Sequence, residues 1–336
     1  MVTVDVGIDL GTTNSCAYYY RRGRYEVVDF DGIRLFPSFV CFNKDKIICG
    51  RGAKLNFGRN NYDVVRNVKR LIGRYYNSQE VQKAINDCGV PVVSRNNKPY
   101  LQVTQNGQVR EYTPSEISAE ILKAMFRRVR EVTSCDIGRV LVTIPANFDA
   151  NQRTATLEAV LYAGIEESQI ALRNEPTAAA ICYGLDQKAI GQNVLVYDLG
   201  GGTFDVSILH IERGKIDVVI HDGDNFLGGS NFDEVILDWL LSEYRRDYEE
   251  DLIDSLPEET KRKARNKLLL ICEEAKEELS SATITEISLP IFLNNDATFS
   301  LTLENLNHLL DDKIEDTMTI VKRALRNVHL SRDSIS

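Results

Sequence analysis

The 336-residue sequence predicts an α/β protein with two lobes. Apolar strand-like runs alternate with amphipathic helical runs, and the chain exceeds the roughly 250–300 residues at which one hydrophobic core usually splits. A third observation is an internal repeat, since residues 6–16 read VGIDLGTTNSC and residues 195–206 read LVYDLGGGTFDV. Both runs place an aspartate, a leucine and a glycine after an apolar strand, which favours two related lobes whose hairpin tips face each other across a cleft.

The first half of the chain predicts strands followed by helices. Apolar or alternating runs predict strands over 4–10, 25–30, 39–42 and 139–145. Residues 64–73, VVRNVKRLIG, have helical spacing. A capping box with proline at the first helical position opens a long helix over 115–132. Two further helices are predicted over 151–164, which ends at a glycine, and over 175–184.

The second half predicts three strands followed by long helices. The strands cover 193–199, 206–212 and 215–224. Helical patterns follow over 232–248 and along the charged segment 257–279. A strand-rich interval with strands at 284–292 and 299–303 precedes a last helix over 314–328.

The composition is that of an ordinary globular protein. The net charge of −9 and the pI near 5.2 argue against a nucleic-acid or anionic-membrane surface. Seven scattered cysteines without a C-x-x-C pair fit reduced thiols in a cytosol-like compartment. No window of 18 apolar residues and no basic leader is present, so we expect no membrane span and a cytoplasmic location. The four histidines show no metal-ligand spacing.

The two glycine turns predict a phosphate site. Glycine lets backbone N–H groups approach an anion without a Cβ in the way, and Thr12, Thr13 and Thr203 add hydroxyl donors. Carboxylates beside a phosphate repel it unless a cation lies between them, so Asp9 and Asp198 predict Mg²⁺ held through waters. One such turn is more often an ordinary hairpin, whereas two matched copies favour the functional interpretation. The sequence has no P-loop, no dinucleotide fingerprint and no protein-kinase motif set.

Five motifs then indicate a family. The segments IDLGTTNS, KRLIG, TIPANFDANQR, NEPTAAAICYGLD and DLGGGTFDVS occur in order along nearly the whole chain. Together they resemble the nucleotide-binding domain of the seventy-kilodalton heat-shock-protein chaperones, within the actin, sugar-kinase and chaperone ATPase superfamily. The resemblance implies an actin-like ATPase fold of duplicated ribonuclease-H-like subdomains with a nucleotide cleft. It implies one lobe over 1–185, with an outer subdomain at about 36–112, and another over 186–336, with an outer subdomain at about 224–305.

The resemblance also implies roles for residues of this sequence. Lys69 would reach the γ-phosphate and help to place the attacking water, and Glu175 and Asp205 would complete the polar wall around that water. Asp198 is the fourth residue that the resemblance implies to be catalytic. Asp9 and Asp198 would flank Mg²⁺ and bound K⁺. Pro145 and Arg153 resemble the family's switch pair. The phosphates, ribose and adenine of ATP or ADP would contact a larger set: Asp9, Gly11, Thr12, Thr13, Asn14, Gly200, Gly201, Gly202, Thr203, Gly228, Gly229, Glu273, Lys276 and Ser280.

Three features depart from the family pattern. Glu277 stands where members often carry a basic or apolar residue against the adenine, and a carboxylate makes no cation–π contact. Ser230 and Asn231 replace the usual acidic pair. The family's following strand, adenosine-motif turn, return helix, linker and peptide-binding domain do not occur in this sequence, which leaves open a fragment or a natural short form.

We therefore expect an ATP-binding, slowly hydrolysing chaperone module, active as a monomer. By analogy its partners would be J-domain co-chaperones and nucleotide-exchange factors, with unfolded clients bound only through the absent peptide-binding domain. Two alternatives remain open. One is a non-catalytic nucleotide- or partner-binding module, favoured by Glu277 and the missing segment. The other is a small-molecule kinase of the same superfamily.

Overall fold

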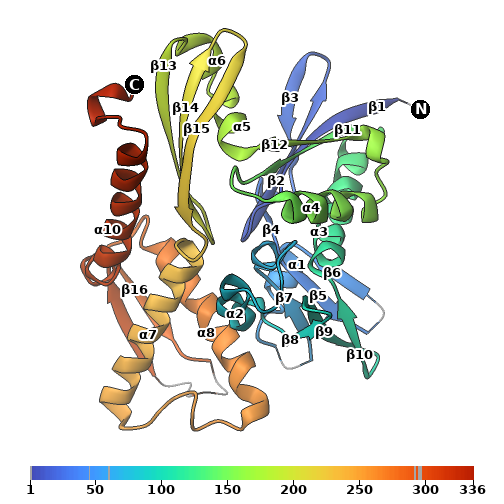
Figure 1. Ribbon diagram of the computed structural model, residues 1–336. Coiled ribbons are helices and arrows are strands. Elements are labelled where there is room, and N and C mark those ends of the chain that lie inside the picture. Colours follow the sequence, from blue (N-terminus) through green and yellow to red (C-terminus); the bar gives the residue numbers. More distant parts are fainter. Residues whose placement is uncertain (1, 45, 60, 291–292, 294–296) are drawn as a thin grey trace.

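The computed structural model describes residues 2–44, 46–59, 61–290, 293 and 297–336. Figure 1 shows two groups of elements side by side: those up to α5 form one lobe, and those from β13 onward form the other. The predicted mixed α/β class and the two lobes are confirmed. The end of the strand predicted over 284–292 lies outside the described residues.

The first lobe is built on a mixed sheet. Its strands are, in spatial order, β12 (Ile170–Asn174), β11 (Asp136–Ile144), β1 (Thr3–Asp9), β2 (Asn14–Arg21) and β3 (Arg24–Val27), with β4 (Phe36–Pro37) paired to β2. β1 runs parallel to β11 and antiparallel to β2. The helices α3 (Pro114–Thr133) and α4 (Ala150–Tyr162) pack on each other, and α5 (Glu175–Cys182) follows β12.

Two small sheets and several short helices extend this lobe. The sheets are β6 (Lys46–Cys49), β5 (Val40–Asn43) and β7 (Asp63–Val65), and β10 (Gln108–Tyr112), β9 (Lys98–Gln105) and β8 (Val92–Arg95). The short helices are α1 (Arg51–Lys54), η1 (Val68–Arg70), α2 (Gln79–Ala84), η2 (Ile85–Cys88) and η3 (Glu167–Gln169).

The second lobe combines an antiparallel sheet with long helices. The sheet is β13 (Gln192–Leu199), β14 (Phe204–Glu212) and β15 (Lys215–Asp224), and a separate hairpin is formed by β16 (Ile284–Ser288) and β17 (Thr298–Thr302). The helices are α6 (Leu185–Lys188), α7 (Gly229–Tyr248), α8 (Glu258–Glu278), α10 (Leu303–Asn327) and η4 (Arg332–Ser334). α10 packs on β14 and β15 (Figure 1).

Two predicted elements differ from the structure. Residues 64–73 are not a helix, because Val64 and Val65 pair with β5 as strand β7. A left-handed Asn67 then separates that strand from η1, which carries Lys69. The last helix begins well before residue 314, because the Thr302 side chain caps it by accepting a hydrogen bond from the Asn305 N–H at 3.0 Å. In both cases a contact outside the hydrophobic pattern decided the boundary.

The lobes also touch far from their inner sheets. Leu270 of α8 is buried in a cluster with Phe39, Phe57 and Val64 of the first lobe. Close by, Lys54 of α1 pairs with Glu273 of α8 at 2.8 Å. The seven cysteines form no disulfide. Among the described residues, no helix is long and apolar enough to cross a membrane.

Helix α3 anchors the core of the first lobe, which gives a stability prediction. Phe126 is fully buried in the main cluster. Phe126→Ala should lower the free energy of unfolding by about 3–5 kcal/mol, because it removes a large apolar side chain and leaves a cavity. Equilibrium urea unfolding followed by circular dichroism measures the change. Val132→Ala on the same helix is the matched control, since Val132 is 39% exposed and its loss should be within about 0.5 kcal/mol of neutral.

Candidate functional site

Two glycine turns, one from each lobe, meet between the inner sheets. The first joins β1 to β2 and carries Thr12 and Thr13, and the second joins β13 to β14. A Cβ added to Gly201 would lie 2.4 Å from Thr13 Oγ1, and one added to Gly202 would lie 2.5 Å from Thr12 Cγ2. Only glycine therefore lets these turns approach so closely. The repeat read from the sequence is two antiparallel hairpins whose tips are in contact.

The start of α7 supports the second turn from behind. The Gly229 N–H donates to the Gly200 carbonyl at 3.0 Å, and the Ser230 N–H donates to the Gly201 carbonyl at 2.6 Å. A Cβ on Gly228 would lie 2.8 Å from the Gly200 carbonyl oxygen. Gly228 and Gly229 thus fix the backbone of the turn rather than standing apart from it.

Charged side chains gather beside the turns. Lys69 of η1 pairs with Glu175, the first residue of α5, at 2.8 Å. Asp198 and Asp205 lie directly opposite each other on β13 and β14. Asp9 ends β1, and its carboxylate accepts a hydrogen bond from the Thr143 hydroxyl at 3.0 Å. The structure therefore brings all four predicted catalytic residues and Asp9 into one cluster.

The pKa values in this cluster show that its carboxylates are crowded. Burial raises the pKa of Glu175 to about 7; Lys69 opposes the rise, and Asp9 and Asp205 add to it. The pKa of Asp198 is raised as well, by burial and then by Asp205 and Asp9. Burial acts to lower the pKa of Lys69, but the surrounding carboxylates, led by Glu175, outweigh it and raise the value. Lys69 is thus a firmly charged ammonium group within an excess of negative charge.

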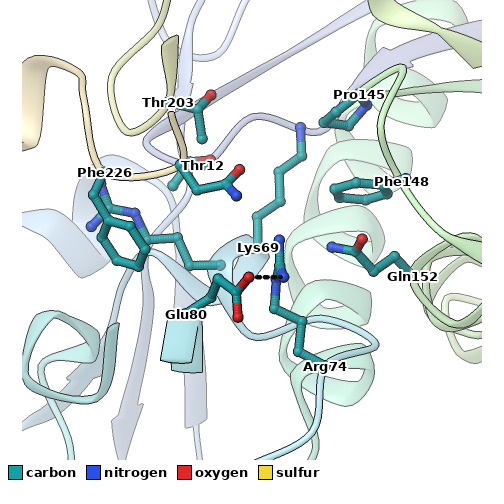
Figure 2. Close-up of a pocket in the computed structure, with 11 residues that line it drawn as sticks. Thr12, Lys69, Arg74, Glu80, Pro145, Phe148, Gln152, Thr203 and Phe226 are labelled. Atoms are coloured by element: carbon teal, nitrogen blue, oxygen red, sulfur yellow. Dashed lines mark ion pairs between the residues drawn. The ribbon is translucent and has the colours of Figure 1, made fainter. Parts of the chain in front are cut away.

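A pocket beside this cluster is lined by residues of both lobes. Figure 2 shows the Lys69 side chain extending between Thr203 on one side and Pro145 and Phe148 on the other. The Lys69 ammonium group lies 5.9 Å from the centre of the Phe148 ring. Arg74 and Glu80 form an ion pair at the lower edge. The side chain assigned to the γ-phosphate therefore points into a pocket shared by both lobes.

Arg70, next to Lys69, joins the lobes directly. Its guanidinium group donates to the Gly202 carbonyl at 2.6 Å, to Asn231 Oδ1 at 3.0 Å and to Asp87 Oδ2 at 2.7 Å. It also lies 5.1 Å from the centre of the Phe226 ring. Near it, the Ser230 hydroxyl lies 3.4 Å from the Thr13 hydroxyl. Ser230 and Asn231, which depart from the family pattern, are thus parts of a contact between lobes.

Of the residues expected at the ribose and adenine, Glu273 and Lys276 bind other groups of the protein, whereas Ser280 is exposed. Glu273 pairs with Lys54 across the lobes. Lys276 donates to the Gly229 carbonyl at 3.0 Å and to Asp233 at 2.5 Å. Burial raises the pKa of Asp233 to about 6, against the influence of Lys276. Ser280 and Glu277 are exposed at the end of α8.

The predicted switch pair lies on either side of one loop. Pro145 follows β11, and its carbonyl accepts a hydrogen bond from the Phe148 N–H at 3.2 Å. Arg153 of α4 donates to the Phe148 carbonyl at 2.9 Å and to Asn174 Oδ1 at 3.2 Å. Asn174 directly precedes Glu175, so this loop is linked to the residue that pairs with Lys69.

Sequence reasoning missed two residues of the site. In the sequence, Lys69 and Arg70 are two adjacent basic residues, a pattern typical of a solvent-exposed surface. Only the tertiary contacts of Arg70 show that it is buried. His221 lies 3.3 Å from Asp205, although no histidine was assigned a role. The predicted β-hairpin over 206–224 does not give the position of His221, because pairing around its turn sets residue 221 opposite residue 206, and only the register shift between Ile208 and Leu209 brings it opposite Ser207.

This fold and this site define a class of protein: two-lobed α/β proteins in which each lobe contributes a glycine turn and an aspartate to a shared site. In the described residues, no group of three or more His, Cys, Asp or Glu side chains has the geometry of a metal site. The comparison with known sequences then identifies the family.

The model of the family described as "Hsp70 protein" matches residues 5–336. The chain is 39% identical over 333 residues to a "Heat shock 70 kDa protein" of Emericella nidulans, covering 98% of this chain and 50% of that protein. The figures are the same for the Neurospora crassa protein of that name, and 38%, 98% and 46% for that of Ajellomyces capsulatus. This chain belongs to the Hsp70 family, whose fold is the actin-like two-lobed ATPase fold. It spans about half the length of the curated relatives it matches.

Glu175 makes the stability of the unligated protein depend on pH. Its pKa is about 7 in the folded protein against 4.5 for an unperturbed carboxyl, so the folded state binds the proton more tightly. Its stabilising contribution is therefore complete below pH 4.5 and is lost as the pH rises through about 7. The unfolding temperature should fall between about pH 5 and pH 8, and it should fall less in Glu175→Gln.

Differential scanning calorimetry across this range tests the statement. Glu274→Gln, which changes an exposed carboxyl on α8, should retain the wild-type dependence. An equally steep fall in Glu175→Gln would contradict the assignment.

The Arg70 contact predicts how firmly the second turn is held. Arg70→Leu removes hydrogen bonds from a charged donor, each worth about 1.5–3 kcal/mol. Backbone amides of residues 200–203 and 228–232 should then exchange hydrogen about 10–100 times faster, as measured by mass spectrometry. Arg74→Leu is the control, because Arg74 pairs with Glu80 within the first lobe. Equal exchange in both variants would show that Arg70 does not hold the turn.

Proposed function

We propose that this chain binds ATP with Mg²⁺ between its lobes and hydrolyses it slowly, as the ATPase module of a molecular chaperone. The observation that carries the proposal is the meeting of two glycine turns beside Lys69 and four carboxylates. Backbone N–H groups without neighbouring Cβ atoms and the hydroxyls of Thr12, Thr13 and Thr203 suit phosphate oxygens. Family membership supports nucleotide binding in general.

The carboxylates fit a divalent cation. Asp198 has a raised pKa because it is buried near Asp205 and Asp9, so a positive ion among these groups would relieve their repulsion. Asp9 and Asp198 would hold Mg²⁺ through waters, with K⁺ beside it. When bound, Mg²⁺ neutralises charge on the phosphates.

The protein's own residues would then position the reaction. Lys69 is fixed by Glu175 at 2.8 Å, so its ammonium group has one orientation in which to meet the γ-phosphate. Asp205 would accept a hydrogen bond from the attacking water and align it with the leaving oxygen. Phosphoryl transfer to water requires positioning and charge stabilisation and no covalent step from the enzyme.

Nucleotide binding would be coupled to movement of the lobes. The turns are in direct contact through Thr13 and Gly201, and Arg70 donates a hydrogen bond to the Gly202 carbonyl of the second turn. Phosphates therefore require the turns to separate, and their binding would trade protein–protein contacts for protein–phosphate contacts. We place the lobe boundary between residues 185 and 186, and the outer subdomains at about 36–112 and 224–305. Pro145 and Arg153 would report the nucleotide state through the loop that leads to Glu175.

Co-chaperone partners are proposed by analogy only. These are J-domain proteins and nucleotide-exchange factors, with a monomeric, cytoplasmic protein as the setting. Glu273, Lys276 and Ser280 would hold the ribose and adenine after Glu273 leaves Lys54. Glu273 and Lys276 already bind other groups of the protein. This observation favours a second candidate function, a nucleotide-binding module without turnover.

Lys69→Ala separates the two functions. We expect single-turnover hydrolysis of ATP to fall by about 100-fold or more, because one preorganised charge at the transferred phosphoryl group is lost. Calorimetric affinity for Mg²⁺-ADP should change only a few-fold. Lys123→Ala is the control, because Lys123 pairs with Glu120 on the surface of α3. Unchanged turnover in Lys69→Ala would reject the mechanism. If the wild-type protein binds Mg²⁺-ADP tightly but does not hydrolyse ATP, the non-catalytic module is favoured.

A further inference from the structure

His221 has a place in the site that the proposed mechanism leaves unused. It lies on β15, paired across the sheet with Ser207 of β14. Asp205 and Ser207 are two residues apart on that strand, so their side chains share one face of the sheet with His221. The side chains of His221 and Asp205 are 12% and 15% exposed.

The contacts of the imidazole ring define its tautomer. Nε2 lies 3.3 Å from Asp205 Oδ1, and Nδ1 lies 3.2 Å from the Ser207 hydroxyl oxygen. A bare nitrogen facing a carboxylate would be repelled, so Nε2 carries the hydrogen in the neutral ring. Nδ1 is then the acceptor of the Ser207 hydroxyl hydrogen. Ser207 is buried, with 2% of its surface exposed, so it orients the ring rather than reacting.

The Nε2 nitrogen of His221 is positioned to form a hydrogen bond with Asp205. Nε2 is buried and has no well-aligned hydrogen-bond acceptor in the described residues, so the contact with Asp205 is close but not yet linear. Catalytic hydrogen bonds are often misaligned before substrate binds. Across the sheet from Asp205 stands Gly223, where a Cβ would lie 3.1 Å from Asp205 Oδ1. A larger residue there would crowd the carboxylate.

The orientation of Asp205 matters to the whole cluster. Its charge contributes to the raised pKa values of Lys69, Glu175 and Asp198. The neighbouring carboxylate Asp222 is not available for this role, because Arg323 of α10 holds both of its oxygens at 2.6 Å. Asp205 is therefore the carboxylate that the Nε2–H group of His221 can fix.

We infer that His221 is a positioning residue for ATP hydrolysis: oriented by Ser207, it holds one oxygen of Asp205 and leaves the other for the attacking water. The inference rests on the proposed function. It assigns His221 no contact with nucleotide, and its effect is exerted through Asp205 alone.

Single-turnover kinetics with prebound ATP test the inference. His221→Ala should lower the hydrolysis rate by about 10-fold or more, in the range found when a group that orients a functional side chain is removed. The dissociation constant for Mg²⁺-ATP should stay within about twofold. His221→Gln should restore much of the rate, because its amide nitrogen can replace Nε2–H as a donor. Ser207→Ala should give an intermediate rate.

His210→Ala is the matched control, because His210 lies on the same strand as Ser207 but contacts Asn193 at the sheet edge. It should hydrolyse ATP like the wild type. Equal rates in His221→Ala and His210→Ala would overturn the inference, and so would a loss of affinity in proportion to the loss of rate. Thermal unfolding of each variant identifies a rate lost through misfolding.

A measurement that needs no hydrolysis separates this inference from the proposed function. In ¹⁵N-histidine-labelled, unligated protein, NMR of the unprotonated His221 ring should place its hydrogen on Nε2, and Ser207→Ala should weaken that preference. The Nδ1–H tautomer in the wild type would overturn the inference even if ATP is hydrolysed. A wild type that shows the Nε2–H tautomer but no turnover would reject the ATPase proposal, and with it the role in hydrolysis.

Discussion

The site depends on one buried ammonium group among carboxylates. Lys69 pairs with Glu175, and the charges of Asp9 and Asp205 also raise its pKa. Asp198 lies opposite Asp205. Removing such a cation would leave several buried negative charges without compensation, which is far less favourable than losing one ion pair. The rest of the site follows from this constraint. Strand ends, a 3₁₀ turn and the first residue of a helix must all deliver their side chains to the same place.

Contacts at two ends of the interface hold the lobes together around that cluster. At the inner end, glycines let the turns meet, and Arg70 bonds to the backbone of the second turn. At the outer end, Leu270 and the Lys54–Glu273 pair join α8 to the first lobe. The inner contact is made of polar groups that phosphates could replace. The outer contact includes an apolar side chain that no anion could replace. The two ends of the interface are therefore held by different kinds of contact.

The sequence predicted the parts of this molecule whose signals are local. The repeated hairpins were predictable because each carries its strand, aspartate and glycine turn within about a dozen residues. The prediction of a helix over 64–73 was wrong, because the pairing of Val64 and Val65 with β5 outweighed their helical spacing. Arg70 and His221 were beyond local patterns, since their roles come from residues of the other lobe or of a neighbouring strand. The residues of the cluster around Lys69 could be named, but their mutual pairing could not.

The contact of Leu270 with Phe39 and Phe57 has a consequence for temperature. Burial of apolar surface is driven largely by water entropy near room temperature and weakens on cooling. The ionic and hydrogen-bonded contacts of Arg70 do not share that dependence. Cooling should therefore weaken the apolar contact of Leu270 before the polar contacts of Arg70, while the Lys54–Glu273 ion pair still joins α8 to the first lobe.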